Sequence, residues 1–225
     1  MKAMILAAGH GTRMRPLTDN TPKPLLKVGG KALIVWHIEK LKRCGFEDIV
    51  INIAYLGEQI PKALGDGSQW GVSIQYSDEQ KEGALETAGG IIKALPLLGT
   101  EPFLVISADV WSDYDYAMPQ FKANELAHLI LIPNPAHNPD GDFHLDPQGY
   151  LHRNGNNKLT FSGIAYYHPE LFAGLSYGKR PIRYVLRNAI DQHQVSGEKY
   201  TGDWRDIGTP ERLKELEGYL EVGRD

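Results

Sequence analysis

The chain has 225 residues, of which 42% are hydrophobic and 23% are charged, and its formal net charge is −4. This length and composition predict one domain, residues 1–225, and exclude a repeat or low-complexity protein. The acidic balance argues against a broad nucleic-acid-binding face, so a phosphate site would have to be local. No stretch resembles a signal peptide or reaches the length of a membrane span. We therefore expect a cytoplasmic protein without nucleic-acid or membrane partners, and the sequence indicates no oligomeric state.

Strand and helix signals alternate through the first half of the chain. Each strand signal is a short apolar or alternating run, and each helix signal places apolar side chains on one face. The order βαβαβ is typical of a mostly parallel sheet. The expected elements are strand 2–6, helix 31–43, strand 48–54, helix 57–64, strand 72–76 and helix 86–95.

The second half begins with two apolar runs, FLVIS at Phe103–Ser107 and HLILIP around Ile130, which are typical of strands buried on both faces. Residues 133–157 are rich in Pro, Asn, Asp and Gly, which favours small hairpins and loops rather than a second domain. Helices are expected at residues 182–192 and 211–220. The predicted fold class is α/β, a three-layer α/β/α sandwich with a mostly parallel, Rossmann-like sheet. Ligands bind such sheets at the carboxyl ends of the strands.

The sequence LAAGHGTRMRPLTDNTPKPLL follows the first strand directly. Gly9 and Gly11 let the backbone turn tightly and bring N–H groups close to an anion, while Arg13 and Lys23 add positive charge. The prolines of TPKP stiffen the chain around Lys23, so its ammonium is held near its place before a ligand arrives. A surface turn with solvated cations is the alternative for a short Gly-x-Gly. Neither GxxxxGK[ST] nor a complete GxGxxG is present, which disfavours a P-loop or a dinucleotide site.

This loop resembles the signature loop of the sugar nucleotidyltransferases, enzymes that join a nucleoside triphosphate to a sugar 1-phosphate. LETAGG at residues 85–90, SAD at 107–109 and WRDIGTPERL at 204–213 resemble further motifs of this family in the same order. The resemblance covers nearly the whole chain. It implies a nucleotide-diphosphosugar transferase fold, Mg²⁺ as cofactor, a nucleoside triphosphate and a sugar 1-phosphate as small-molecule partners, and release of pyrophosphate.

The resemblance assigns roles to residues of the loop. Arg13 matches the catalytic arginine, which would stabilise charge on the triphosphate and the leaving group, and Lys23 would bridge the phosphates. Gly11 and Thr12 would contribute backbone contacts to phosphate, and Gly83 matches a glycine whose backbone meets the base. The attacking oxygen of a sugar phosphate is already an anion, so the chemistry requires positive charge and positioning rather than a general base.

Two aspartates match the metal ligands of the family. Asp109 directly follows the strand FLVIS, and Asp206 lies between Trp204 and Gly208. Mg²⁺ takes a few carboxylate oxygens and completes its shell with water and phosphate oxygens, so two aspartates are sufficient. Asp206 is also expected to contact the substrate. Either aspartate alone would suit a loop or helix cap, and the histidines lack the paired spacing of a zinc site.

The side chain that accompanies Gly83 at the base is left open by the sequence. Asp78, Glu79 and Gln80 all precede this glycine, and the register among them is not fixed. A carboxylate at this position could accept the N3–H of uracil.

Residues for the acceptor sugar are assigned from their place in the chain. Asp142 and Asn156 lie in the segments where the family contacts the sugar, although both residue types also serve hairpin turns. The Glu-Lys-Pro element whose lysine binds the sugar phosphate in many relatives is absent, which leaves Arg153 or Lys158 as substitutes.

Within the family, the compact chain favours a minimal enzyme without an appended β-helix. Together with SDEQKEGALETAGG and WRDIGTPERL, it favours uridylyl transfer from UTP to N-acetylmuramate 1-phosphate in bacterial peptidoglycan recycling. Guanylyl transfer to mannose 1-phosphate is the alternative. A non-catalytic nucleotide-sugar sensor is disfavoured because the matched cations and aspartates are all present. An NAD-dependent oxidoreductase is disfavoured because the glycine fingerprint is incomplete.

Overall fold

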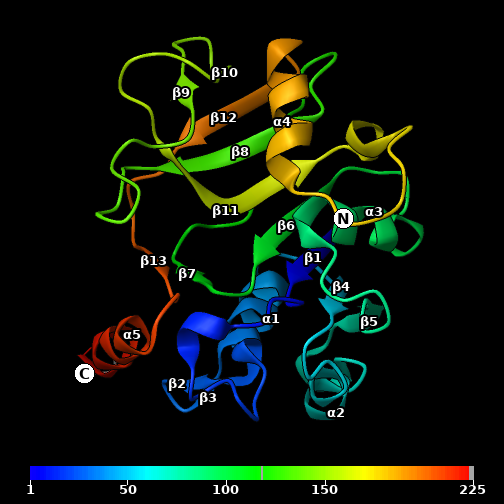
Figure 1. Cartoon of the computed structure of the whole chain (residues 1–225), viewed down its shortest axis with the longest axis vertical. Helices are drawn as coiled ribbons and strands as arrows, with labels where there is room; N and C mark the ends of the chain where they lie inside the picture. The colour runs from blue at the N-terminus through cyan, green and yellow to red at the C-terminus, as the bar shows by residue number, and fades with distance from the viewer. Residues whose placement is uncertain (118, 223–225) are drawn as a thin grey trace.

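The computed structural model describes residues 1–117 and 119–222. Its centre is a seven-stranded sheet with the strand order β12-β8-β11-β6-β1-β4-β5, so that β1 lies in the interior of the sheet (Figure 1). The strands are β1 (Lys2–Leu6), β4 (Asp48–Ile53), β5 (Ser73–Asp78), β6 (Phe103–Ser107), β8 (Ala127–Ile132), β11 (Thr160–Tyr167) and β12 (Val195–Lys199).

Strand directions in this sheet confirm the mostly parallel arrangement. β1 pairs in parallel with β4 and β6, β4 pairs in parallel with β5, and β12 pairs in parallel with β8. β11 runs antiparallel to both β6 and β8. Because β11 is reversed between them, β8 and β6 point the same way. The carboxyl ends of β1, β4, β5, β6, β8 and β12 therefore lie along one edge of the sheet.

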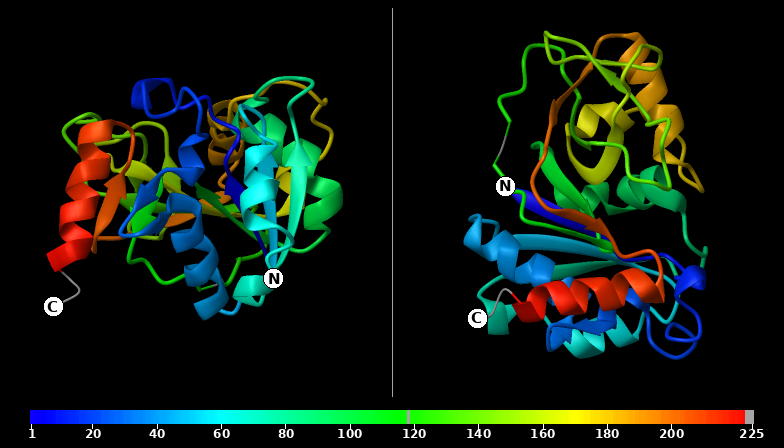
Figure 2. Two further views of the ribbon diagram at one scale, coloured as in Figure 1. Left: turned by 90° about the horizontal axis from the view of Figure 1, so that it is seen from below. Right: turned by 90° about the vertical axis from the view of Figure 1, so that its left-hand side faces the viewer.

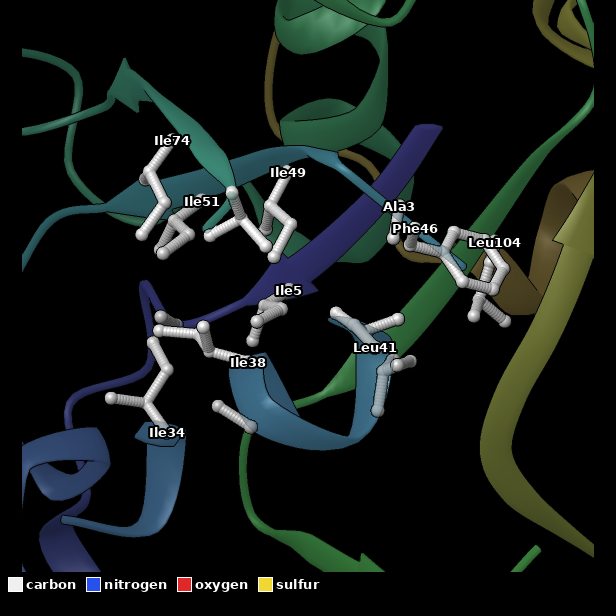
Figure 3. Packing of buried hydrophobic residues seen from close by; sticks show 14 of the residues in the cluster. Ala3, Ile5, Ile34, Ile38, Leu41, Phe46, Ile49, Ile51, Ile74 and Leu104 are labelled. Atoms are coloured by element: carbon white, nitrogen blue, oxygen red, sulfur yellow. The ribbon is translucent and has the colours of Figure 1, made fainter. Parts of the chain in front are cut away.

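Helices cover both faces of the sheet, which confirms the three-layer sandwich (Figure 2). Along β1, Ala3 and Ile5 face one apolar cluster and Met4 faces the other, as expected for alternating side chains of a strand. Ile5 packs beside Ile38 of the first helix in the first cluster (Figure 3). The helices are α1 (Leu33–Arg43), α2 (Gln59–Leu64), α3 (Glu86–Leu98), α4 (Ile182–Asp191) and α5 (Pro210–Val222).

Short elements complete the fold. The 3-10 helices are η1 (Thr12–Met14), η2 (Lys23–Leu25), η3 (Ser68–Trp70) and η4 (Pro169–Phe172). The short strands pair as β2 (Lys27–Val28) with β3 (Lys31–Ala32), β9 (His144–Leu145) with β10 (Leu151–His152), and β7 (Val110–Ser112) with β13 (Trp204–Asp206). No helix in the described ranges is long and apolar enough to cross a membrane.

The structure differs from the predicted elements at the start of the first helix and in two strands of the central sheet. The expected helix over 31–43 starts at Leu33, because residues 31–32 pair with residues 27–28 across the turn at Gly29 and Gly30. Strands β11 and β12 were not predicted, although β11 lies inside the sheet. The loop-rich region 133–157 does contain only the short hairpin β9–β10 among its described elements, as expected.

Candidate active site

A cleft of about 550 Å³ opens at the carboxyl edge of the sheet. Its wall is formed by the loop after β1, the end of β4, the loop between β5 and α3, and the turn after β6. Lys179, in the segment before α4, and Gly208, before α5, complete the wall. The polar or charged side chains and glycines that line it are Gly9, His10, Gly11, Thr12, Arg13, Lys23, Asn52, Glu79, Glu86, Thr87, Ser107, Asp109, Lys179 and Gly208.

The backbone of the loop after β1 depends on Gly11. This residue has φ of 62°, and a Cβ built on it would lie 3.1 Å from Thr18 Cγ2 and 3.2 Å from Lys23 Cβ. The Thr18 hydroxyl donates a 2.8 Å hydrogen bond to the Gly11 carbonyl. A side chain at position 11 would therefore have a strained backbone, and Thr18 and Lys23 would have to move to make room for it. The close packing brings Lys23 back beside the glycine turn.

Two cations of this loop face the cleft in different states. Arg13 lies in η1, is exposed, and makes no hydrogen bond or ion pair with residues 1–117 or 119–222. Lys23 lies in η2 between Pro22 and Pro24, and its Nζ is 2.8 Å from Asp109 Oδ2. Arg13 is thus a free cation on a short helix, whereas Lys23 is held in place.

The two aspartates meet through the short strand pair β7–β13. Asp206 lies opposite Val110, and the Ile207 N–H donates a 2.8 Å hydrogen bond to the Asp109 carbonyl. A Cβ built on Gly208 would lie 3.1 Å from Asp206 Oδ1 and 3.2 Å from Arg13 Nη1. The carboxylate of Asp206 and the guanidinium of Arg13 therefore approach Gly208 closely, and Arg13, Lys23, Asp109 and Gly208 all line the first cleft.

Asp206 is also held from α5, by a contact that the sequence did not predict. Arg212 donates a hydrogen bond from Nη1 to Asp206 Oδ2. Its Nη2 lies 3.1 Å from His137 Nδ1, and His137 Nε2 lies 3.5 Å from Asp206 Oδ2. These three residues line a second cleft of about 400 Å³, with Trp204 and Arg205. Asp206 consequently lies between the two clefts.

The far end of the first cleft is built around Glu79. Its Oε1 accepts a 2.7 Å hydrogen bond from Asn52 Nδ2, and its Oε2 accepts a 2.8 Å hydrogen bond from the Leu85 N–H. Asn52 Oδ1 in turn accepts a 2.8 Å hydrogen bond from the Ala7 N–H. Burial raises the pKa of the Glu79 carboxyl. Both oxygens of Glu79 are used within the protein, so this residue fixes the β5–α3 loop against the ends of β1 and β4.

Of the three residues that the sequence left open beside Gly83, only Glu79 lines the first cleft, and the side chain that meets the base stays a prediction. Asp78 and Gln80 are exposed, and the Gln80 N–H donates a 2.8 Å hydrogen bond to Asp78 Oδ1, whereas Glu79 is fully buried. Gly83 has φ of 76° and does not line the cleft. The next residue, Ala84, does line it, and the backbone contact of Gly83 with the base stays a prediction.

The chain resembles known proteins in sequence and in fold. Residues 2–141 match the family model described as Nucleotidyl transferase. The chain belongs to the nucleotidyl transferase family. It is 56% identical over 225 residues to the N-acetylmuramate alpha-1-phosphate uridylyltransferase of Neisseria meningitidis serogroup B, covering 96% of this chain and 97% of that protein. The enzyme of the same description from Caulobacter vibrioides is 30% identical, with 97% and 96% of the two chains covered.

More distant members of the nucleotidyl transferase family also match. The mannose-1-phosphate guanylyltransferase catalytic subunit beta of Drosophila melanogaster is 28% identical over 93% of this chain and 60% of its own length. A solved structure from Bacillus anthracis, described as a candidate glucose-1-phosphate thymidylyltransferase, superposes with a TM-score of 0.82. It covers 98% of this chain and 95% of its own at 23% identity. This structural likeness supports the fold.

The two residues predicted to bind the acceptor sugar, Asp142 and Asn156, make contacts within the protein and lie outside both clefts. Asp142 Oδ2 accepts a 2.8 Å hydrogen bond from the Phe161 N–H, and the Asn156 carbonyl lies 2.6 Å from His144 Nδ1. Neither Asp142 nor Asn156 lines one of the two clefts. Both stabilise loops of the 133–161 region in this structure, and their contact with a sugar stays a prediction.

The oxygen ligands of the site fit a hard divalent cation. Asp109 and Asp206 are partly exposed, with 36% and 16% of their side chains accessible, and Oδ2 of each contacts a cation, Lys23 or Arg212. No group of three or more His, Cys, Asp or Glu side chains suited to a metal is present in residues 1–117 and 119–222. Two carboxylates fit Mg²⁺ in a nucleotidyl transferase, because this ion takes its remaining ligands from water and phosphate.

Proposed function

We propose that this nucleotidyl transferase is a magnesium-dependent uridylyltransferase that converts UTP and N-acetylmuramate 1-phosphate to UDP-N-acetylmuramate and pyrophosphate, in bacterial peptidoglycan recycling. The observation that carries the substrate assignment is the 56% identity, over nearly the full length of both chains, to an enzyme of this description. The cleft supports the reaction class, because two cations of the β1 loop face the aspartate that follows β6.

The reaction is a substitution at the α-phosphorus of UTP. An anionic oxygen of the acceptor phosphate forms the new P–O bond, and the bond from the α-phosphorus to the bridging oxygen of the β-phosphate breaks. Pyrophosphate leaves with that electron pair, so no proton has to be removed from the nucleophile. The enzyme must align two strongly anionic reactants and stabilise the charge that develops on the leaving group.

Residues of the loop after β1 would bind the nucleotide phosphates and the leaving group in different ways. Arg13 lines the cleft, is exposed and has no side-chain partner among the described residues, so its guanidinium is available for the leaving pyrophosphate. Lys23 is held by the flanking prolines and by Asp109, so its ammonium is already in position when the nucleotide phosphates bind. The left-handed turn at Gly11 keeps this segment of backbone bare, which allows phosphate to approach its N–H groups.

Asp109 and Asp206 would hold Mg²⁺, which supplies positive charge to the phosphates when it is bound. The strand pair β7–β13 fixes the backbones of both aspartates relative to one another. Arg212 orients the carboxylate of Asp206 from α5. Arg153 and Lys158, the candidates for the sugar phosphate, line neither cleft, and Arg153 pairs with Asp191 at 2.8 Å.

Guanylyl transfer to mannose 1-phosphate is less well supported. Five guanylyltransferases among the matches are 27% to 35% identical, and the chain spans 59% to 62% of their length. The two N-acetylmuramate alpha-1-phosphate uridylyltransferases match over almost their whole length instead.

A pyrophosphate-release screen tests the proposed function. UTP, GTP and dTTP would each be combined with N-acetylmuramate, N-acetylglucosamine, mannose and glucose 1-phosphates, with Mg²⁺ varied and removed by chelator. UTP with N-acetylmuramate 1-phosphate should give the highest kcat/KM, and chelation should abolish turnover. A preference for GTP with mannose 1-phosphate would overturn the substrate assignment. Binding without turnover for every pair would identify a sensor instead.

A further inference from the structure

Glu86 adopts a backbone conformation that its residue type disfavours. Its φ is 64°, in the left-handed region, at the first position of α3. A residue with a Cβ is strained there, whereas glycine is not. Strain of this kind is found where the surrounding structure holds a side chain in place for a function, so the direction of the Glu86 side chain is informative.

The Glu86 side chain lines the first cleft, together with that of Lys179 from the segment before α4. Lys179 Nζ lies 3.8 Å from Glu86 Oε1, and the two side chains are 70% and 46% exposed. An ion pair this exposed and this long adds little stability. The pair therefore does not explain why position 86 carries a strained glutamate.

The backbone places Lys179 opposite Glu86. The N–H groups of Ala88 and Gly89 donate hydrogen bonds of 3.0 and 3.1 Å to the Arg180 carbonyl, and the Arg180 N–H donates one of 2.9 Å to the Leu85 carbonyl. These bonds fasten the segment around Lys179 to the start of α3. They also occupy the N–H groups of Ala88 and Gly89, and the charged residues of these two segments that line the cleft are Glu86 and Lys179.

The charges of the pair suit an uncharged, hydroxylated part of a substrate. A carboxylate accepts hydrogen bonds from two vicinal hydroxyls, and an ammonium donates to hydroxyl or ring oxygens. The phosphate-binding cations Arg13 and Lys23 come from a different segment, the loop after β1. Together, Glu86 and Lys179 carry no net charge, so they do not compete with those cations for phosphate.

We propose that Glu86 and Lys179 form a sugar-ring-binding pair at the nucleotide cleft, and that the left-handed backbone of Glu86 presents its carboxylate to the ring hydroxyls. This inference rests on the proposed function, in which both substrates carry such a ring. The ring is either the ribose of UTP or the acceptor sugar, and the two sources share the same hydroxyl chemistry.

Substrate analogues that lack one hydroxyl separate the two sources. Wild-type protein, Glu86→Gln, Lys179→Met and the exposed control Glu101→Gln would be assayed with UTP, 2′-deoxy-UTP and 3′-deoxy-UTP. They would also be assayed with N-acetylmuramate 1-phosphate and its 4- and 6-deoxy analogues. Glu86→Gln should reduce the wild-type preference for one hydroxylated substrate over its deoxy analogue by about tenfold or more, the effect of one hydrogen bond to a charged group. A loss confined to the nucleotide series identifies ribose, and a loss confined to the acceptor series identifies the acceptor sugar.

A strain-relieving variant distinguishes binding from a structural role. Glu86→Gly removes the carboxylate but suits the left-handed backbone, so it should lose the same discrimination without a lower Tm. Unchanged discrimination in both series, for both Glu86 variants, would overturn the inference. Calorimetric binding of the nucleotides and sugar phosphates measures the discrimination without turnover. If wild type fails to turn over the proposed substrates, the proposed function fails, while the binding data still decide the role of the pair.

Discussion

Lys23 Nζ lies 2.8 Å from Asp109 Oδ2, so the loop after β1 and the turn after β6 are joined by an ion pair across the cleft. The lysine side chain is 11% exposed and that of the aspartate 36%. Bound phosphate would compete with Asp109 for the same ammonium. In the proposed function, this contact would keep Lys23 in place until phosphate binds, with the proposed metal ligand Asp109 beside it.

Replacing Lys23 should weaken both binding and turnover. Lys23→Met removes the ammonium that the nucleotide phosphates meet, and we expect kcat/KM for UTP to fall by about a hundredfold or more. The exposed Lys27→Met, in strand β2 directly after this loop and outside the cleft, is the matched control and should stay near wild type. Steady-state kinetics with UTP varied would decide this. A Lys23→Met enzyme as active as the control would remove Lys23 from the site.

Arg13→Ala should affect the transition state more than stability. We expect a loss of about 3 kcal/mol in transition-state stabilisation, as for removal of one preorganised donor. Tm should barely change, because Arg13 is exposed and has no partner in the described part of the chain. Arg15→Ala is the control, since Arg15 pairs with Asp19 at 3.3 Å on the surface. Equal activity of the two variants would show that Arg13 is only a surface cation.

Neutralising either aspartate should remove magnesium dependence and most activity. Asp109→Asn and Asp206→Asn each delete a charge from the proposed metal site while nearly keeping its shape. In the structure each carboxylate is paired with a cation, Lys23 or Arg212, so the variants should lower Tm modestly in chelator. Turnover against Mg²⁺ concentration is the measurement. Wild-type magnesium dependence in one variant would exclude that aspartate as a ligand.

The elements that the sequence predicts well are those with one dominant pattern. β1, β4 and β6 are apolar runs buried on both faces, and their periodicity needs no long-range information. β11 is hidden because its pairing with β8 shifts register between Phe161 and Ala165, and it contains Gly163 with φ of 81°. β12 is an edge strand that ends in exposed Glu198 and Lys199, so it lacks the apolar signal of a central strand.

The residues of the site also differ in how far the sequence alone predicts them. Arg13, Lys23 and Asp109 belong to local motifs, so the sequence places them at the carboxyl ends of neighbouring strands. The contact between His137 and Arg212 spans 75 positions and depends on how α5 docks, which no local pattern reveals. The left-handed conformation of Glu86 is likewise invisible in sequence, because glutamate at a helix start is ordinary.

Stability towards acid should depend on His37, which lies on α1 behind the turn that carries Asp109. Its side chain is buried and bonded to the backbone of Ala108. Burial lowers the pKa of His37 from 6.5 to about 4, although the bond to Ala108 opposes this. Between pH 6.5 and about pH 4, the unfolded chain binds a proton at His37, whereas the folded chain does not. The contribution of His37 is therefore fully present above pH 6.5 and is lost as the pH falls towards 4.

Denaturant unfolding of wild type and His37→Gln at pH 7 and pH 4.5 measures this contribution. The amide of glutamine can keep a hydrogen bond to the Ala108 backbone but does not take up a proton in this range. Wild type should lose about 2–3 kcal/mol more free energy of unfolding than the variant between the two pH values, since one pKa unit corresponds to about 1.4 kcal/mol. The carboxylates that titrate in the same range are common to both proteins, so they cancel in the difference. A constant offset between the two proteins at both pH values would mean that His37 is not the group responsible.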